Sequence, residues 1–173
     1  MVRAQDAQLE EGDEASLLIL REMEKIYPDN KEMLFNIGDG SFHTGQYTQA
    51  VEYFRKVLVM DPTSERTLSH LAWAYQSVEN YDKLLEVARQ WVSVTGPGQS
   101  HLWLNIAYAA TGRFELGLKS LEQVGELYPE NYAITDLIVQ LYTYQGKYDK
   151  TEVEAKILVA EDQVTVRRWT NTC

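Results

Sequence analysis

The sequence predicts an all-α fold, a right-handed superhelical α-solenoid built from antiparallel helix pairs. Two features predict it. One period, of about 34 residues, runs through most of the chain, and apolar residues fall at helical spacing in two bursts within each period. The period is seen in the pairs Pro28/Pro62, Tyr47/Tyr81, Gly112/Gly146 and Phe114/Tyr148, whose members are one period apart. Each period therefore predicts one helix pair.

The first full period, residues 31–64, shows how the two helices are predicted. Small and apolar residues at intervals of three and four mark one face of the first helix: Leu34, Ile37, Gly38 and Ser41. Gly45 suits the left-handed conformation that ends a helix. The second helix then carries its own apolar face: Tyr47, Ala50, Val51, Phe54, Val57 and Leu58. It ends at Asp61-Pro62 because a proline ring blocks a continuing helix, and Thr63 or Ser64 can cap the next helix.

The same positions recur in three further periods, residues 65–97, 98–131 and 132–163. The first unit has Leu34, Ile37, Gly38, Ser41, Gly45, Tyr47, Ala50, Phe54, Val57 and Pro62. The second has Leu68, Leu71, Ala72, Tyr75, Glu79, Tyr81, Leu84, Ala88, Trp91 and Gly96. The third has His101, Leu104, Asn105, Tyr108, Gly112, Phe114, Gly117, Leu121, Val124 and Pro129. The fourth has Thr135, Ile138, Val139, Tyr142, Gly146, Tyr148, Thr151, Ala155, Leu158 and Gln163. This pattern resembles the tetratricopeptide repeat (TPR), a helix-turn-helix unit with a W-x₂-L-G-x₂-Y motif.

The resemblance spans nearly the whole chain, so we expect residues 1–173 to form one TPR domain. Residues 14–30 are predicted to be the second helix of a partial leading repeat. Residues 164–173 are predicted to be a tail or the start of a truncated repeat, because Trp169 falls one period after Thr135. Departures from the family pattern of small residues gather in the last two units, where we expect wider or shifted helix interfaces. They are Asn105, Gly117, Val139 and Thr151.

The composition is that of a globular chain with an acidic surface. The 173 residues are 45% hydrophobic and 24% charged, with a formal net charge of −10. Such a surface repels nucleic acid and anionic lipid, so we expect neither as a partner. The single cysteine, Cys173, excludes a disulfide framework and a thiolate metal site and favours a reducing, cytoplasmic compartment. No apolar run reaches membrane-spanning length, so we expect no membrane insertion.

The stretch NIGDGSFHTG, residues 36–45, has the residue types of a phosphate loop or a nucleophile with its base. It lacks the preceding strand and the Gly-Lys-Ser/Thr ending of a phosphate loop, and the repeat explains its glycines. The three histidines, His43, His70 and His101, lie on the first helices of three successive units without a metal-binding motif. We therefore expect no catalytic residues, no metal, no cofactor and no enzymatic activity.

The resemblance implies that the first helix of each unit lines a concave groove that binds peptides. The residues expected to face this groove are Phe35, Asn36, Asp39, Phe42, His43, Arg66, Ser69, His70, Trp73, Gln76, Leu102, Trp103, Ile106, Asp136, Gln140 and Tyr144. Its aromatic members offer large contact areas at little entropic cost. An alternative for Trp73 and Trp103 is that they fill the gap between adjacent first helices.

TPR co-chaperones that hold an acidic chaperone tail resemble one another in a set of lysine, asparagine and arginine residues. At the matching places this chain has Phe35 and Asp39, then His70, then Gln99 and Trp103. Because the cations are missing, we expect no chaperone-tail receptor, and a peptide ligand should be neutral to basic with apolar anchors.

The sequence thus predicts a non-catalytic protein–protein interaction scaffold or adaptor that holds a partner segment in its groove. Two alternatives stay open. The chain is a structural module that self-associates through its stack ends, or it is a regulatory repeat segment of a larger signalling protein.

Overall fold

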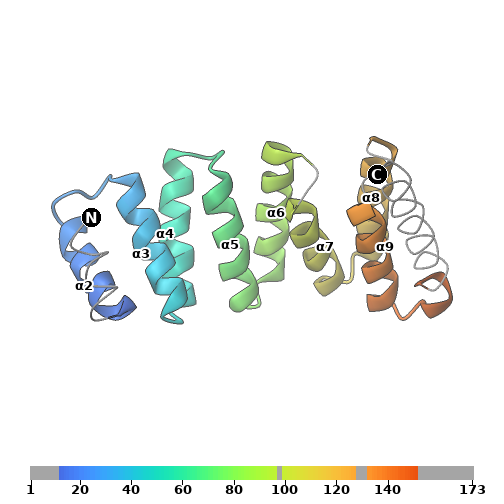
Figure 1. The fold of residues 1–173 in the computed structure, drawn as a ribbon, viewed down its shortest axis with the longest axis horizontal. Helices are drawn as coiled ribbons and strands as arrows, with labels where there is room; N and C mark the ends of the chain where they lie inside the picture. Colours follow the sequence, from blue (N-terminus) through green and yellow to red (C-terminus); the bar gives the residue numbers. More distant parts are fainter. Residues whose placement is uncertain (1–11, 97–98, 128–131, 152–173) are drawn as a thin grey trace, which may run out of the picture. The chain divides into compact units, whose positions relative to one another are not determined.

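The computed structural model describes residues 12–96, 99–127 and 132–151, and these residues form helices and turns without a strand (Figure 1). The chain divides into two compact units, Met1–Gly96 and Pro97–Cys173. Within each unit, successive helices pack against each other as antiparallel pairs (Figure 1). The predicted class, an all-α solenoid of antiparallel helix pairs, is confirmed.

The first unit contains the helices that carry most of the predicted groove residues. The described helices of this unit are α2 (Asp13–Glu24), α3 (Lys31–His43), α4 (Tyr47–Met60), α5 (Glu65–Ser77) and α6 (Tyr81–Thr95), and the groove residues lie on α3 and α5. Each helix packs on the next from α2 to α6, and α3 also contacts α5 directly. This contact between the first helices of two successive pairs brings their side chains to one face.

The second unit contains α7 (Gln99–Ala110), α8 (Phe114–Leu127) and α9 (Tyr132–Tyr144). Helix α8 packs on both α7 and α9, and α7 also contacts α9. Its core is made of the leucines and isoleucine of α8 and α9: Leu118, Leu121, Ile134, Leu137 and Leu141. Residues 152–163 of the fourth predicted repeat and the tail with Trp169 lie outside the described residues.

The predicted turn glycines adopt the backbone conformation that the repeat requires. Gly45, Gly112 and Gly146 have φ angles of 75°, 68° and 69°. Glu79 stands at the corresponding place in the second repeat and has a φ of 55°. A side chain in this left-handed region is sterically strained, so the repeat imposes the conformation even where glycine is missing. The predicted cap is confirmed as well, because the Ser64 hydroxyl accepts from the Thr67 N–H at 3.4 Å.

The helix crossing at Gly38 also agrees with the prediction. A Cβ placed on Gly38 would lie 2.8 Å from Cε1 of Phe54, which is closer than such atoms can approach. Gly40 is different, since a Cβ there would lie 3.4 Å from Cδ1 of Leu17 at an ordinary contact distance. Gly38 therefore sets the spacing between α3 and α4, whereas Gly40 does not limit it.

In the third repeat a polar residue, Asn105, occupies the helix-crossing position that Gly38 holds in the first repeat. Asn105 is buried, and its Nδ2 donates to the carbonyl oxygen of Leu137 at 2.9 Å, which links α7 to α9. A Cβ on Gly117 of α8 would lie 2.8 Å from Cδ1 of Leu141. The glycine on α8 thus provides room beside the larger asparagine.

Helix α2 is attached to α4 by a polar contact at the edge of the core. The Tyr53 hydroxyl donates to Oε2 of Glu24 at 2.6 Å, and Lys56 Nζ donates to Oε1 at 3.1 Å. Burial and the Glu24 carboxylate raise the pKa of Tyr53 to about 12. Burial acts to raise the pKa of Glu24, but the hydrogen bonds from Tyr53 and Lys56 outweigh it and lower that pKa.

A candidate peptide-binding face on α3 and α5

Helices α3 and α5 present a row of side chains at intervals of three and four residues, which place them on one side of each helix. We call this row the α3–α5 face; its members are Phe35, Asp39, Phe42, His43, Arg66, His70 and Trp73. Contacts between the two helices join most of these residues, and all of them belong to the groove expected from the sequence.

One end of the face is a buried ring beneath a cation. The Phe35 side chain is 3% exposed, and its ring centroid lies 5.0 Å from that of His70 and 5.4 Å from that of Phe54. The Arg66 guanidinium lies 3.7 Å above the Phe35 ring and donates to Oε1 of Glu32 at 2.8 Å. The Glu32 carboxylate compensates the charge of this arginine, and stacking on the Phe35 ring holds its guanidinium in place.

The middle of the face contains one carboxylate between two imidazoles. Oδ1 of Asp39 lies 3.6 Å from Nε2 of His43 on the same helix and 3.5 Å from Nε2 of His70 on α5. This oxygen is buried and has no hydrogen-bond partner among the described residues. The Asp39 side chain as a whole stays 33% exposed, so part of the carboxyl group remains open to solvent.

The other end of the face is aromatic and open. The Trp73 side chain is 48% exposed and meets the Phe42 ring edge-on at a centroid distance of 6.3 Å. The Phe42 ring also lies 5.3 Å from that of Tyr47. An exposed tryptophan supported by a second ring offers a rigid apolar surface, which is the kind of residue that dominates binding energy at interfaces.

The other predicted residues of the first unit border this face. Asn36 and Ser69 are half-buried, and Gln76 is exposed. The Ser69 hydroxyl donates to the Arg66 carbonyl oxygen at 2.8 Å, so its polar group is occupied within the helix.

The predicted residues of the second unit are placed differently. The Trp103 side chain is 6% exposed, and Leu102 packs against the core of α8 and α9. Ile106 is half-buried. On α9, Gln140 Nε2 donates to Oδ2 of Asp136 at 2.8 Å, and Tyr144 is exposed. In this unit the predicted tryptophan is therefore buried, and the open aromatic group is Tyr144.

His101 lies at a core position of the third repeat and carries no groove function. Its side chain is 4% exposed, and burial lowers its pKa, so the neutral imidazole is favoured. Within the described part of the chain, no group of three or more His, Cys, Asp or Glu side chains is arranged to hold a metal ion. None of the described helices is long and apolar enough to cross a membrane.

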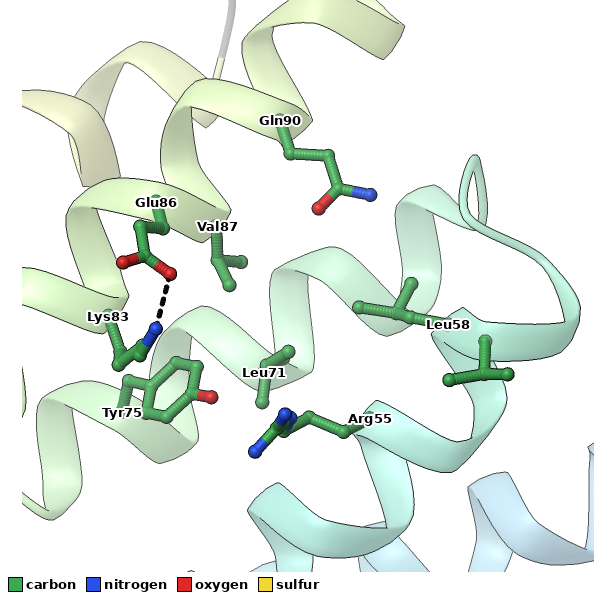
Figure 2. A pocket seen from close by; sticks show the side chains of 9 residues that line it. Arg55, Leu58, Leu71, Tyr75, Lys83, Glu86, Val87 and Gln90 are labelled. Atoms are coloured by element: carbon green, nitrogen blue, oxygen red, sulfur yellow. Dashed lines mark hydrogen bonds and ion pairs between the residues drawn. The ribbon is translucent and has the colours of Figure 1, made fainter.

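Sequence reasoning missed a hollow of about 270 Å³ between α4 and α6, where α5 forms the floor (Figure 2). Leu71 and Tyr75 of α5 line it, while Arg55 of α4 and Lys83 of α6 stand at its rim. Lys83 Nζ is paired with Oε2 of Glu86 at 2.7 Å (Figure 2). Burial raises the pKa of the Tyr75 hydroxyl. The repeat pattern assigns Leu71 and Tyr75 to the core and therefore gives no sign of a hollow. The one signal in the sequence was that Arg55 and Val59, four residues apart on α4, share a helix face outside the apolar pattern.

Comparisons with known proteins agree with the repeat architecture. Tetratricopeptide repeat profiles match residues 31–64 and 67–98. The Hsp70-Hsp90 organising protein of Plasmodium falciparum is 27% identical over 109 residues, which is 63% of this chain and 41% of that protein. A second sequence of that name, from isolate 3D7, matches over 18% of its length. The chain therefore spans less than half of the curated relatives it matches.

Solved structures resemble the chain over nearly its whole length. A crystal structure of MamA has a TM-score of 0.75 and 16% sequence identity and covers 95% of this chain and 96% of its own. The TPR-like repeats of a kinesin light chain from Podosopora anserina have a TM-score of 0.73 and 17% identity, over 94% and 92% of the two chains. At these identities the likeness concerns the fold alone. The repeat profiles, the helix pairs and the positive-φ turns together identify residues 31–98 as tetratricopeptide repeats.

Proposed function

We propose that the chain is a non-catalytic, cytoplasmic interaction scaffold that holds a segment of a partner protein against the α3–α5 face. The observation that carries the proposal is Trp73, which is 48% exposed and supported edge-on by Phe42. Protein binding is the usual role of this repeat family, and the Asp39 carboxylate beside an apolar ring surface fits a segment that is neutral to basic with apolar anchors.

The partners need not be those in the name of the curated relative. That protein is named for organising Hsp70 and Hsp90. The positions that would clamp an acidic tail carry Phe35, Asp39 and His70 here, and Asp39 would repel a terminal carboxylate. We therefore propose a different, less acidic partner segment.

The proposal is tested by recovering a partner with the whole chain, mapping the bound peptide and measuring its affinity for variants. Trp73→Ala should weaken binding at least about tenfold, because exposed interface tryptophans are frequent hot spots. The matched control is Val59→Ala on α4, since Val59 is 84% exposed but lies outside the α3–α5 face. Unchanged affinity in a folded Trp73→Ala variant would refute the assignment of the face. Trp103→Ala is a poor substitute, because Trp103 is buried and its loss would disturb packing.

A further inference from the structure

Among the described residues, the ion-pair partners of Asp39 are two histidines and not a lysine or an arginine. Arg66 is engaged by Glu32 at 2.8 Å and by the Phe35 ring. The structure shows no lysine or arginine of the described residues paired with Asp39, and its neighbours are His43 and His70. Because neutral imidazoles carry no charge, the carboxylate is an uncompensated anion whenever both histidines are neutral.

The hydrogen bonds of His70 decide which of its nitrogens can face Asp39 as a donor. Nδ1 of His70 lies 2.8 Å from the Arg66 carbonyl oxygen, which can only accept, so Nδ1 carries the hydrogen. In the neutral ring, Nε2 then presents a lone pair to Oδ1 of Asp39 at 3.5 Å. Neutral His70 therefore cannot satisfy Asp39, whereas the imidazolium form donates from Nε2 directly to the carboxylate.

The open aromatic end of the face begins one helical turn beyond this carboxylate. Asp39 and Phe42 are three residues apart on α3, as are His70 and Trp73 on α5, so both helices place a ring next to the acidic position. A carboxylate beside exposed aromatic rings suits a guanidinium or ammonium group, which pairs with the anion and stacks on the rings.

We propose that the α3–α5 face receives a basic side chain of the partner segment, paired with Asp39 and lying against Trp73 and Phe42, and that protonation of His43 and His70 releases it. This inference rests on the proposed function and specifies its ligand: an arginine or lysine flanked by apolar residues. At neutral pH Asp39 is available to the ligand cation. In mild acid the imidazolium groups neutralise Asp39 and repel the cation.

Other titratable groups near this site are engaged or lie elsewhere. On α4 the neighbours are rings, with Phe54 at 5.7 Å from His70 and Tyr47 beside Phe42. On α2, Arg21 bonds to Gln46 and Gln49, and Glu24 is held by α4. On α6, Lys83 pairs with Glu86 at the hollow. The titratable groups that lie directly beside Asp39 are therefore His43 and His70.

The experiment uses two peptides, acetyl-Leu-Arg-Leu-amide and the same peptide with neutral citrulline in place of arginine. Binding to the whole chain is followed by NMR, with the Trp73 indole N–H as the reporter, at pH 7.5 and 5.5 and constant ionic strength. At pH 7.5 the arginine peptide should bind at least about fivefold more tightly than the citrulline peptide, because only arginine forms a charge-assisted pair. At pH 5.5 this preference should fall below about twofold.

Variants separate the carboxylate from its histidines. Asp39→Asn should abolish the preference for arginine at pH 7.5, whereas Asp82→Asn, the same charge change at an exposed residue of α6, should leave it intact. The double variant His43→Gln/His70→Gln should keep the preference at both pH values. If this variant does not fold, the wild-type chain gives a second readout: saturating arginine peptide should move the titration of the His43 and His70 ring protons to lower pH, since linkage is reciprocal.

Each outcome distinguishes this inference from the broader function. Equal binding of both peptides at Trp73 would overturn the charge specificity and leave the face as an apolar binding surface. Binding of both peptides without a change at Trp73 would refute the proposed function as well. Failure of the arginine peptide to bind at pH 7.5, or a preference for arginine that survives Asp39→Asn, would overturn the inference.

Discussion

Helices α5 and α7 occupy the same place in two successive repeats, yet they present different surfaces. His70 and Trp73 of α5 correspond to Trp103 and Ile106 of α7, each one repeat further on. On α5 the tryptophan is 48% exposed, whereas on α7 the tryptophan stands at the position of His70, one helical turn earlier, and is 6% exposed. A large ring in the first helix of a repeat is therefore exposed or buried according to its position in the repeat, and composition alone does not distinguish the two.

The same contrast runs through the helix crossings. The first repeat uses Gly38 to bring α3 against Phe54, while the third repeat inserts Asn105 and bonds it to the backbone of α9. The first solution depends on the absence of a side chain and the second on one specific hydrogen bond. The two units should consequently respond to different substitutions.

The largest effect is expected for Asn105→Asp. The change removes the donor to the Leu137 carbonyl oxygen and buries a carboxylate in its place, which should cost about 3 kcal/mol or more at pH 7. Urea denaturation measures the loss. Asn36→Asp on α3 is the matched control, because Asn36 is half-buried, and its cost should stay within about 1 kcal/mol. Similar losses for the two variants would show that the Asn105 bond does not stabilise the second unit.

A second pair of substitutions compares the glycines at the crossings. Gly38→Ala should destabilise the chain by about 1–3 kcal/mol, since the new methyl group meets the rigid Phe54 ring in a packed core. Gly117→Ala should cost less, because the nearest atom is the end of the flexible Leu141 side chain. Gly40→Ala is the internal control and should stabilise by up to about 1 kcal/mol through helix propensity. If thermal unfolding shows that the Gly40→Ala variant is less stable than the Gly38→Ala variant, close packing of α3 on α4 at Gly38 is not the cause.

Substitutions in the turns between paired helices should change the free energy of unfolding by a smaller amount. Glu79 adopts a φ of 55° where the other repeats have glycine, so Glu79→Gly should stabilise by about 1 kcal/mol. Gly112→Ala, at the corresponding turn of the next repeat, should destabilise by a similar amount, about 1 kcal/mol. Chemical denaturation of both variants checks the pair, and changes of the same sign would be inconsistent with turn strain as the cause.

The smallest expected change concerns pH. His101 occupies the repeat position that Leu68 holds in α5, and burial lowers its pKa below the ordinary value of about 6.5. Below that value the unfolded chain binds a proton that the folded chain resists, so stability should decrease as the pH falls from about 6.5 toward 5. His101→Leu should remove this part of the pH dependence in urea titrations. An identical pH profile in a folded His101→Leu variant would exclude His101 as its source.

The sequence allowed the repeat architecture to be predicted because its determinants are local. Gly45 in the turn, Ser64 at a helix start and Gly38 at a crossing each act through residues of the same repeat or of the first turn of the next one, and their spacing is visible in one sequence. The groove list was implied by the resemblance to the repeat family, which places the first helix of each unit along the groove, and it stays a prediction.

Other features depend on contacts between helices that the pattern does not specify. The meeting of Asp39 with His43 and His70 requires α3 and α5 to lie at one particular distance and rotation. The burial of Trp103 depends on its surroundings, and the accommodation of Asn105 depends on a carbonyl group of α9. The hollow between α4 and α6 also arises from packing, since its floor residues occupy ordinary core positions.

The most direct test of the account is a hydrogen-exchange map of the whole chain with and without the mapped partner peptide. Because exchange slows where a bound segment stabilises the backbone, added protection should fall on α3 and α5, and little should appear on α7 and α9. Protection confined to α7 and α9, or to α4 and α6 around the hollow, would contradict the assignment of the α3–α5 face as the binding surface.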